Sequence, residues 1–148
     1  MIRALLSLAI MAAGSAPALA QSATPLPPNL AGLWNFEAEV QPICSFTGQA
    51  RLIPQADPAS FGCELTARQD CPAADVTFTV EQTCTARIED GELTVRSTIV
   101  NFLEGAPTAF YLPDNFQLEI KDESTLDGVL LGSGAYPAIW RRAEGAIS

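Results

Sequence analysis

Apolar and polar residues alternate along residues 34–52. The even positions are apolar or small from Trp34 to Leu52, whereas the odd positions are mostly polar, with Ile43 as the main exception. Successive side chains of a β-strand point to opposite faces of a sheet, so this alternation predicts a sheet with one dry face and one wet face. Pro42 has no N–H group to donate, and we expect it to mark a bend, bulge or edge between two strand segments.

The same alternation recurs along the rest of the chain, interrupted by Pro-, Gly- and Asp-containing turns. Residues 89–92 carry the Asp-Gly pair that is typical of a tight hairpin. About eight or nine strands and no convincing helix predict an all-β fold: an antiparallel up-and-down β-barrel of about eight strands, with a β-sandwich as the alternative. Beyond the first stretch, the predicted strands are 61–68, 76–88, 93–103, a short one at 109–112, 116–120, 125–131 and 138–142.

The first twenty residues have the features of a secretory signal peptide. Arg3 is followed by an apolar segment, and Ala18-Leu19-Ala20 forms a small-x-small cleavage site. No later apolar run approaches the roughly 20 residues that a membrane span requires. We therefore expect cleavage after Ala20 and a soluble protein in the periplasm or secreted, with no membrane insertion once the signal is removed.

The mature chain has the length of one domain. Residues 21–31 contain three prolines and no periodicity, which predicts a flexible N-terminal arm. A single barrel domain is predicted at 32–142, followed by a loose C-terminal tail at 143–148.

Charge and composition exclude several kinds of chemistry. The chain has 17 acidic and 8 basic residues, a formal net charge of −9, and no histidine. Such an acidic surface argues against nucleic acid and anionic membranes as partners. The lack of histidine removes the commonest general base and the commonest metal ligand. The carboxylates of 89–92 and 122–123 fall in predicted turns, where solvated charge is the simplest interpretation. We therefore expect no enzymatic activity, no metal site and no cofactor.

Four cysteines in an exported domain predict two disulfides, since no CxxC motif or histidine supports a metal site. Four cysteines allow three connectivities. A loop at 54–60 centred near residue 57 would place Cys44 opposite residue 70 or 71. A turn at 72–75 would place Cys63 opposite Cys84. Opposite residues of an antiparallel pair share a face and lie within bridging distance. Hairpin register thus favours Cys44–Cys71 and Cys63–Cys84.

Bulky apolar residues on the inward positions are expected to line the barrel. An eight-stranded barrel is either filled by side chains or holds one small ligand. The density of bulky residues favours a filled interior, which would move function to the arm and to the loop at 104–113, with its pair Phe110 and Tyr111. The expected lining residues are Phe36, Phe46, Phe61, Phe78, Phe116 and Leu118.

The two ends of the predicted domain carry a resemblance. Gly32-Leu33-Trp34 opens the first strand, and Trp140-Arg141-Arg142 closes the last. First and last strands are neighbours in a closed barrel, so Arg141 or Arg142 could lie across Trp34 and close the base by stacking and cation–π attraction. This arrangement resembles the calycin superfamily of lipocalins and avidin-like barrels, in which a G-x-W strand and a late arginine play that part.

The front of the chain resembles a second family. Residues 30–34 (LAGLW), preceded by a Ser- and Pro-containing arm and followed ten residues later by Cys44, are similar to the small exported bacterial inhibitors of serralysin-type metalloproteases. The resemblance implies a disulfide-bonded barrel whose arm enters the protease cleft. The chain departs from that family in having four cysteines rather than two and a longer second half. The arm residues it implicates are Ser22, Thr24, Pro25 and Leu26.

Taken together, the sequence predicts a non-enzymatic exported barrel that binds a small apolar ligand inside it or a protein partner at its rim. The alternatives are a periplasmic metalloprotease inhibitor that uses its N-terminal arm and an accessory subunit of a cell-envelope complex. We expect a monomer unless the chain belongs to such a complex.

Overall fold

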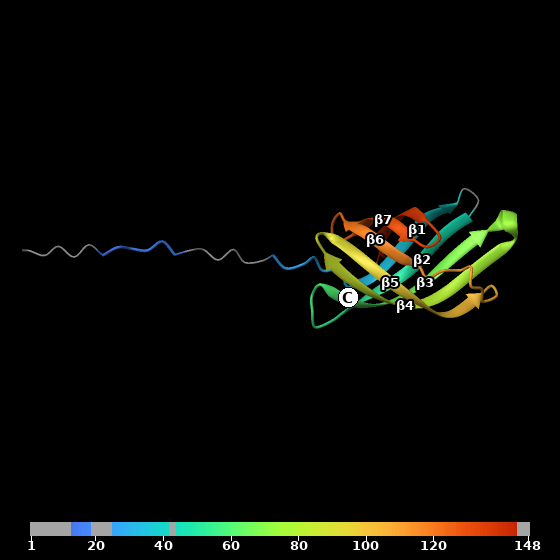
Figure 1. Ribbon diagram of the computed structural model, residues 1–148, viewed down its shortest axis with the longest axis horizontal. Helices are drawn as coiled ribbons and strands as arrows, with labels where there is room; N and C mark the ends of the chain where they lie inside the picture. The colour runs from blue at the N-terminus through green and yellow to red at the C-terminus, as the bar shows by residue number, and fades with distance from the viewer. Residues whose placement is uncertain (1–12, 19–24, 42–43, 145–148) are drawn as a thin grey trace, which may run out of the picture.

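Eight antiparallel strands follow one another around a closed barrel in the computed structural model, which describes residues 13–18, 25–41 and 44–144 (Figure 1). Each strand pairs with its neighbours in chain order, and the first also pairs with the last. The up-and-down barrel predicted from the sequence is confirmed, and the β-sandwich is excluded. The elements are β1 (Gly32–Gln41), β2 (Cys44–Pro54), β3 (Ser60–Cys71), the 3-10 turn η1 (Pro72–Ala74), β4 (Val76–Glu89), β5 (Glu92–Glu104), β6 (Asn115–Ile120), β7 (Thr125–Leu131) and β8 (Ala135–Arg142).

The barrel has two unlike ends. One end, here called the base, holds the start of β1, the end of β8 and the connections at 55–59, 90–91 and 121–124. The other end, here called the mouth, holds η1 and the loop at 105–114. The N-terminal arm leaves the barrel at the base (Figure 1). Closure of the sheet and the two predicted disulfides make the fold consistent with a calycin-like barrel.

The Asp-Gly hairpin forms as the sequence predicts. Asp90 and Gly91 both have positive φ, 52° and 78°, between the paired residues Glu89 and Glu92. A two-residue turn with positive φ at both positions has a backbone twist that matches the right-handed twist of the flanking strands. Glycine adopts this conformation without a steric penalty.

The short strand predicted at 109–112 is wrong. These residues belong to the loop that connects β5 to β6. Gly105 leaves β5 with a φ of 84°, and the N–H of Tyr111 closes a turn onto the carbonyl of Thr108 at 3.3 Å. Pro113 contributes no N–H group to a ladder. In this apolar run one side chain, that of Tyr111, turns inward, and the segment forms no paired strand.

Both predicted disulfides are present. Cys63 and Cys84 lie directly opposite each other in the β3–β4 ladder, with their Cα atoms 4.5 Å apart. Cys44 and Cys71 join β2 to β3 at the mouth, with Cα atoms 4.2 Å apart. The register that follows from the two turns therefore fixes the connectivity. Two bridges in a domain of this size fit a periplasmic or extracellular protein.

An aromatic cluster fills the middle of the barrel. The ring of Phe36 lies 5.3 Å from Phe116, 5.4 Å from Trp140 and 5.8 Å from Phe46, measured between ring centroids. Offset and edge contacts at these separations add to the stabilisation from burial. Phe61 and Leu118, also expected inside, are buried as well. Phe78 differs: it is only half-buried, because it lies on β4 close to the mouth, above the packed core.

The base is closed by the last part of the arm. Leu30 is fully buried in the core, and its carbonyl accepts a hydrogen bond from Trp34 Nε1 at 2.9 Å. The packed domain therefore begins before Gly32, where the sequence places the end of the arm. At the other terminus, the N–H of Ala143 still bonds the carbonyl of Leu33, so the first residue of the predicted tail extends the barrel.

The predicted signal peptide and its cleavage site lie largely outside the described residues, as do Ser22 and Thr24 of the arm and Pro42. In the part of the chain that is described, no helix has the length and apolar character needed to cross a membrane.

Candidate functional site

A pocket of about 380 Å³ opens at the mouth of the barrel. Side chains from six strands and from the loop at 105–114 converge on it because every second connection of an up-and-down barrel lies at this end. Its volume is within the range of small-molecule sites. The lining residues are Val40, Phe46, Gln69, Val76, Phe78, Thr108, Phe110, Tyr111, Leu112, Asp114, Leu130, Gly132, Ser133 and Tyr136.

Aromatic side chains stiffen one wall of this mouth pocket. The rings of Phe78 and Tyr111 lie 5.4 Å apart in an edge-to-face arrangement. Phe102 packs against both, at 6.2 Å from Phe78 and 5.8 Å from Tyr111. The three rings belong to β4, β5 and the connecting loop, so they hold that loop onto the barrel.

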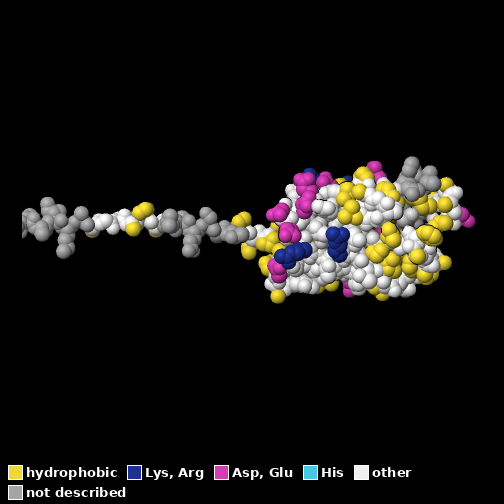
Figure 2. Space-filling model, viewed as in Figure 1, with side chains coloured by type: hydrophobic (Ala, Val, Ile, Leu, Met, Phe, Trp, Pro, Cys, Tyr) yellow, Lys and Arg dark blue, Asp and Glu magenta, His cyan; other side chains and the backbone are white. Residues whose placement is uncertain are grey.

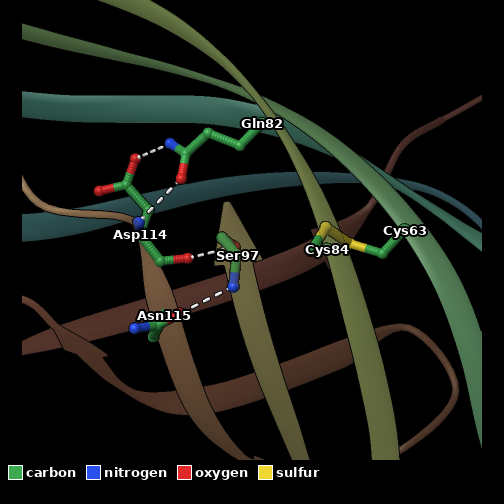
Figure 3. Close-up of a disulfide and its surroundings, with 6 residues drawn as sticks. All are labelled: Cys63, Gln82, Cys84, Ser97, Asp114 and Asn115. Carbon is green, nitrogen blue, oxygen red and sulfur yellow. Dashed lines mark hydrogen bonds between the residues drawn. A yellow bond between two sulfur atoms is a disulfide. The ribbon is translucent and has the colours of Figure 1, made fainter. Parts of the chain in front are cut away.

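A buried carboxyl group lies beside this wall. Asp114, the last residue before β6, is 5% exposed. Its Oδ2 accepts hydrogen bonds from the Tyr111 hydroxyl, at 2.9 Å, and from Nε2 of Gln82. The N–H of Asp114 returns a bond to Gln82 Oε1 at 2.9 Å (Figure 3). The other carboxylate oxygen, Oδ1, points away from Gln82 in Figure 3 and receives no hydrogen bond from any described residue.

The backbone around Asp114 is fixed by β5. Regular pairing of β5 with β6 ends at Val95 and Phe116. Beyond it, Ser97 donates its N–H to Asn115 Oδ1 at 2.8 Å and its hydroxyl to the carbonyl of Asp114 at 2.6 Å (Figure 3). These two bonds extend the contact between the strands, so the Asp114 side chain enters the barrel at a set position.

Burial controls the ionisation of this group. Desolvation raises the pKa of Asp114 to about 6, although the hydrogen bonds from Tyr111 and Gln82 favour the charged form. Desolvation and the nearby carboxylate raise the pKa of Tyr111, which therefore stays a neutral donor. The site thus holds a carboxyl group that is ionised at neutral pH and has one oxygen without a donor.

The rim of the mouth is apolar and exposed. Phe110 is 95% exposed. Leu112, two residues further along the loop, and Leu103, near the end of β5, are about half-exposed. Figure 2 shows a cluster of hydrophobic side chains near the end of the barrel that lies away from the arm. An incoming molecule would therefore meet an apolar edge before it reaches the buried carboxyl.

Other hollows lie on the outer wall and have a different character. One of about 430 Å³ runs over β2, β3 and β4, and its lining residues include Arg51, Glu64 and Thr83. Arg51 and Glu64 are exposed, outward-facing side chains of the wet face. We therefore place the candidate site at the mouth, where a titratable group is buried.

The residues proposed to close the barrel have separate places. The guanidinium carbon of Arg142 lies 4.6 Å from the centroid of the Trp34 ring, at the base. Arg141 points outward and pairs with Glu37 at 2.9 Å. In the arm, Pro25 and Leu26 are exposed, Leu26 at 86%. Base, arm and mouth pocket are thus distinct features, and of the predicted lining residues only Phe46 and Phe78 reach the pocket.

Sequence reasoning missed the polar pair at the centre of the site. Gln82 occupies an inward position in the alternation of 76–88, and Asp114 shares the inward phase of Phe116 and Leu118. Two polar residues on inward positions are the available signal, since buried polar groups need partners. The sequence indicates the loop at 104–113, which carries Tyr111, as a candidate functional loop, but it does not indicate that the Tyr111 side chain points inward.

The described residues hold no group of three or more side chains of the types that bind metals. No protein-family model and no curated protein matches this chain.

Proposed function

We propose that this protein is an exported, non-enzymatic binding module that takes a small, mainly apolar molecule into the mouth pocket. The observation that carries the proposal is the combination of a packed aromatic core below and a pocket of about 380 Å³ above it. A barrel of eight strands has room for one small ligand at most, and here the free space lies at one end.

The lining supports an apolar ligand with a polar contact. Five of the lining residues are aromatic: Phe46, Phe78, Phe110, Tyr111 and Tyr136. Small-molecule sites typically combine such surfaces with a few placed polar groups. The calycin-like closure of the base supports the same proposal, because Arg142 over Trp34 closes that end of the barrel and leaves the mouth as the end open to a ligand.

The rigidity of the mouth also supports binding rather than a collapsible gap. The Cys44–Cys71 disulfide joins β2 and β3 there, and the Phe78, Tyr111 and Phe102 rings hold the loop at 105–114. A site formed before the ligand arrives costs less ordering entropy on binding.

The experiment is a fluorescence titration of the mature protein with N-phenylnaphthylamine, a neutral apolar probe. Val76→Trp places a large ring in the wall of the pocket and is expected to weaken binding at least about tenfold. Val100→Trp, at a 61% exposed position on the outer wall, is the matched control and is expected to bind like the wild type. Absence of saturable binding, or equal binding by both variants, would overturn the proposal.

A second function, inhibition of a serralysin-type metalloprotease, is favoured by the anchoring of the arm. Its last residues are held at the base through Leu30 and Arg142, while Pro25 and Leu26 project into solvent. An arm that is anchored next to the barrel and exposed at Pro25 and Leu26 suits insertion into a cleft. Full-length protein at micromolar concentration should slow such a protease, and deletion of residues 21–28 should abolish the effect. A full-length chain without effect would end this second proposal.

A further inference from the structure

We propose that the mouth pocket selects a small organic cation, an amine on an apolar body, whose ammonium group pairs with Oδ1 of Asp114. This inference rests on the proposed function and names the chemical class of its ligand.

The first argument is charge. Asp114 is the one charged side chain among the described residues that line the pocket. A buried carboxylate without a counter-ion is unfavourable, and a cation placed against it recovers interaction that water would otherwise supply. The lining residues that the structure describes include no arginine or lysine to play this part. An anionic ligand would meet the repulsion of the same carboxylate.

The second argument is the inequivalence of the two carboxylate oxygens. Oδ2 is occupied by the donors Tyr111 and Gln82, which fix the plane of the carboxyl group. Oδ1 has no donor among the described residues, although the side chain as a whole is buried. A ligand with an N–H donor supplies the missing bond, and a charged donor gives a shorter and stronger bond than a neutral one.

The third argument is the aromatic wall. Tyr111, whose hydroxyl bonds the carboxyl, packs edge-to-face on Phe78. Aromatic faces attract ammonium groups, and the attraction grows when the pair is desolvated. The carboxylate and the rings thus act on the same part of a ligand, while the rim around Phe110 suits its apolar part.

The fourth argument is the charge of the whole chain, −9 with only 8 basic residues. A negative surface raises the local concentration of cations and increases their association rates.

The ionisation of the site agrees with this preference. At neutral pH the Asp114 carboxyl is charged, because its pKa is about 6. The groups that act on it are Tyr111 from the loop and Gln82 from β4, and neither carries a charge.

The test compares phenethylamine with phenethyl alcohol, which has the same ring and chain but is neutral. Titrations follow the amide signals of the full mature protein by NMR at about pH 7.5. We expect the amine to bind at least about tenfold tighter than the alcohol. Asp114→Asn keeps the shape and one acceptor oxygen but removes the charge, so it should abolish the preference for the amine. A preference that survives in this variant would overturn the proposal.

A measurement on the wild type guards against a variant that fails to fold. Phenethylamine stays protonated in mild acid, whereas the Asp114 carboxyl becomes neutral below about pH 6. The tenfold preference should therefore shrink to about twofold or less near pH 4.5. A preference that does not change with pH would overturn the assignment of the cation to Asp114.

The remaining outcomes are distinct. If the alcohol binds as tightly as the amine, the cation inference falls and the proposed function stands. If neither probe binds, the cation inference falls, and the titration with N-phenylnaphthylamine decides the proposed function separately. If a lysine-containing tripeptide binds about tenfold tighter than phenethylamine, the small-molecule ligand is wrong and the source of the ammonium group is a polypeptide.

Discussion

Arg142, near the C-terminal end of the barrel, lies over the ring of Trp34 at its beginning, with 4.6 Å between the guanidinium carbon and the ring centroid. The same guanidinium donates to three backbone carbonyls. Nε bonds Glu123 at 2.8 Å, Nη1 bonds Ala31 at 2.7 Å and Nη2 bonds Asn29 at 3.0 Å. One side chain therefore joins the arm, the first strand and the connection between β6 and β7.

Replacing Arg142 by lysine should destabilise the barrel although the charge is kept. A lysine ammonium cannot reproduce the planar fork that reaches three carbonyls and stacks on the ring. We expect the free energy of unfolding to fall by about 1–2 kcal/mol. Arg141→Lys is the control, because Arg141 is exposed and has only the surface pair with Glu37. It should change the free energy by less than about 0.5 kcal/mol. Equal losses in urea denaturation would contradict the role of Arg142.

The two tryptophans offer a matched comparison inside the core. Both are fully buried, but Trp34 Nε1 donates to the carbonyl of Leu30, whereas Trp140 Nε1 has no partner among the described residues. Each Trp→Phe change removes the same ring volume. Trp34→Phe also leaves a buried carbonyl without its donor, which costs about 1–3 kcal/mol. Trp34→Phe should thus lower the free energy of unfolding more than Trp140→Phe, by about that amount. The opposite order in thermal and urea denaturation would refute this account.

Two truncations of the arm should distinguish residues 29–30, which contact the barrel, from the residues before them. The described arm residues 25–28 are not part of the core, and we expect deletion of residues 21–28 to shift the melting temperature by less than about 2 °C. Deletion of residues 21–30 removes Leu30 and the hydrogen-bond acceptor of Trp34. Loss of a buried leucine costs about 2–5 kcal/mol. Calorimetry of the two truncated proteins tests where the packed domain begins. A large loss of stability in the shorter deletion would move that boundary towards Pro25.

The sequence predicts the barrel well because the information is local and periodic. Alternation fixes which side chains point inward, and the turn residues fix the register, so Cys63 can be placed opposite Cys84 from the chain alone. The strand predicted at 109–112 is wrong because the local pattern does not determine the structure of this segment. Its apolar residues suit a strand, but Gly105 and Pro113 interrupt the ladder, and the direction of Tyr111 is decided by Phe78 and Phe102.

The site is predicted less completely because its partners are distant in the chain. Gln82 and Asp114 are 32 residues apart, and only the closed sheet brings their side chains together. Alternation places each on an inward position, but it carries no information about which inward polar residues meet. That pairing depends on how far β5 and β6 overlap, which Ser97 and Asn115 determine.

Ionisation of Asp114 should make the barrel less stable as the pH rises. Its pKa is raised from 3.8 to about 6 in the folded protein, so between these values the folded state binds more protons than the unfolded state. The free energy of unfolding must therefore decrease with rising pH across this window. The effect is on the order of 2–3 kcal/mol between about pH 4 and pH 7.

Asp114→Asn removes this dependence, because the amide keeps an acceptor for Tyr111 and Gln82 and has no proton to lose. Relative to the wild type, the variant should gain stability steadily from about pH 4 to pH 7 in urea denaturation. Asp57 is a control of opposite sign: the pKa of its exposed carboxyl is lowered, mainly by the hydrogen bond from the backbone N–H of Ala59. Its contribution is present above its ordinary pKa and is lost as the pH falls below that value and through the lowered pKa of the folded protein. Asp57→Asn should therefore lose stability at neutral pH and little in strong acid. Parallel curves for the wild type and Asp114→Asn would show that the buried carboxyl does not oppose folding at neutral pH.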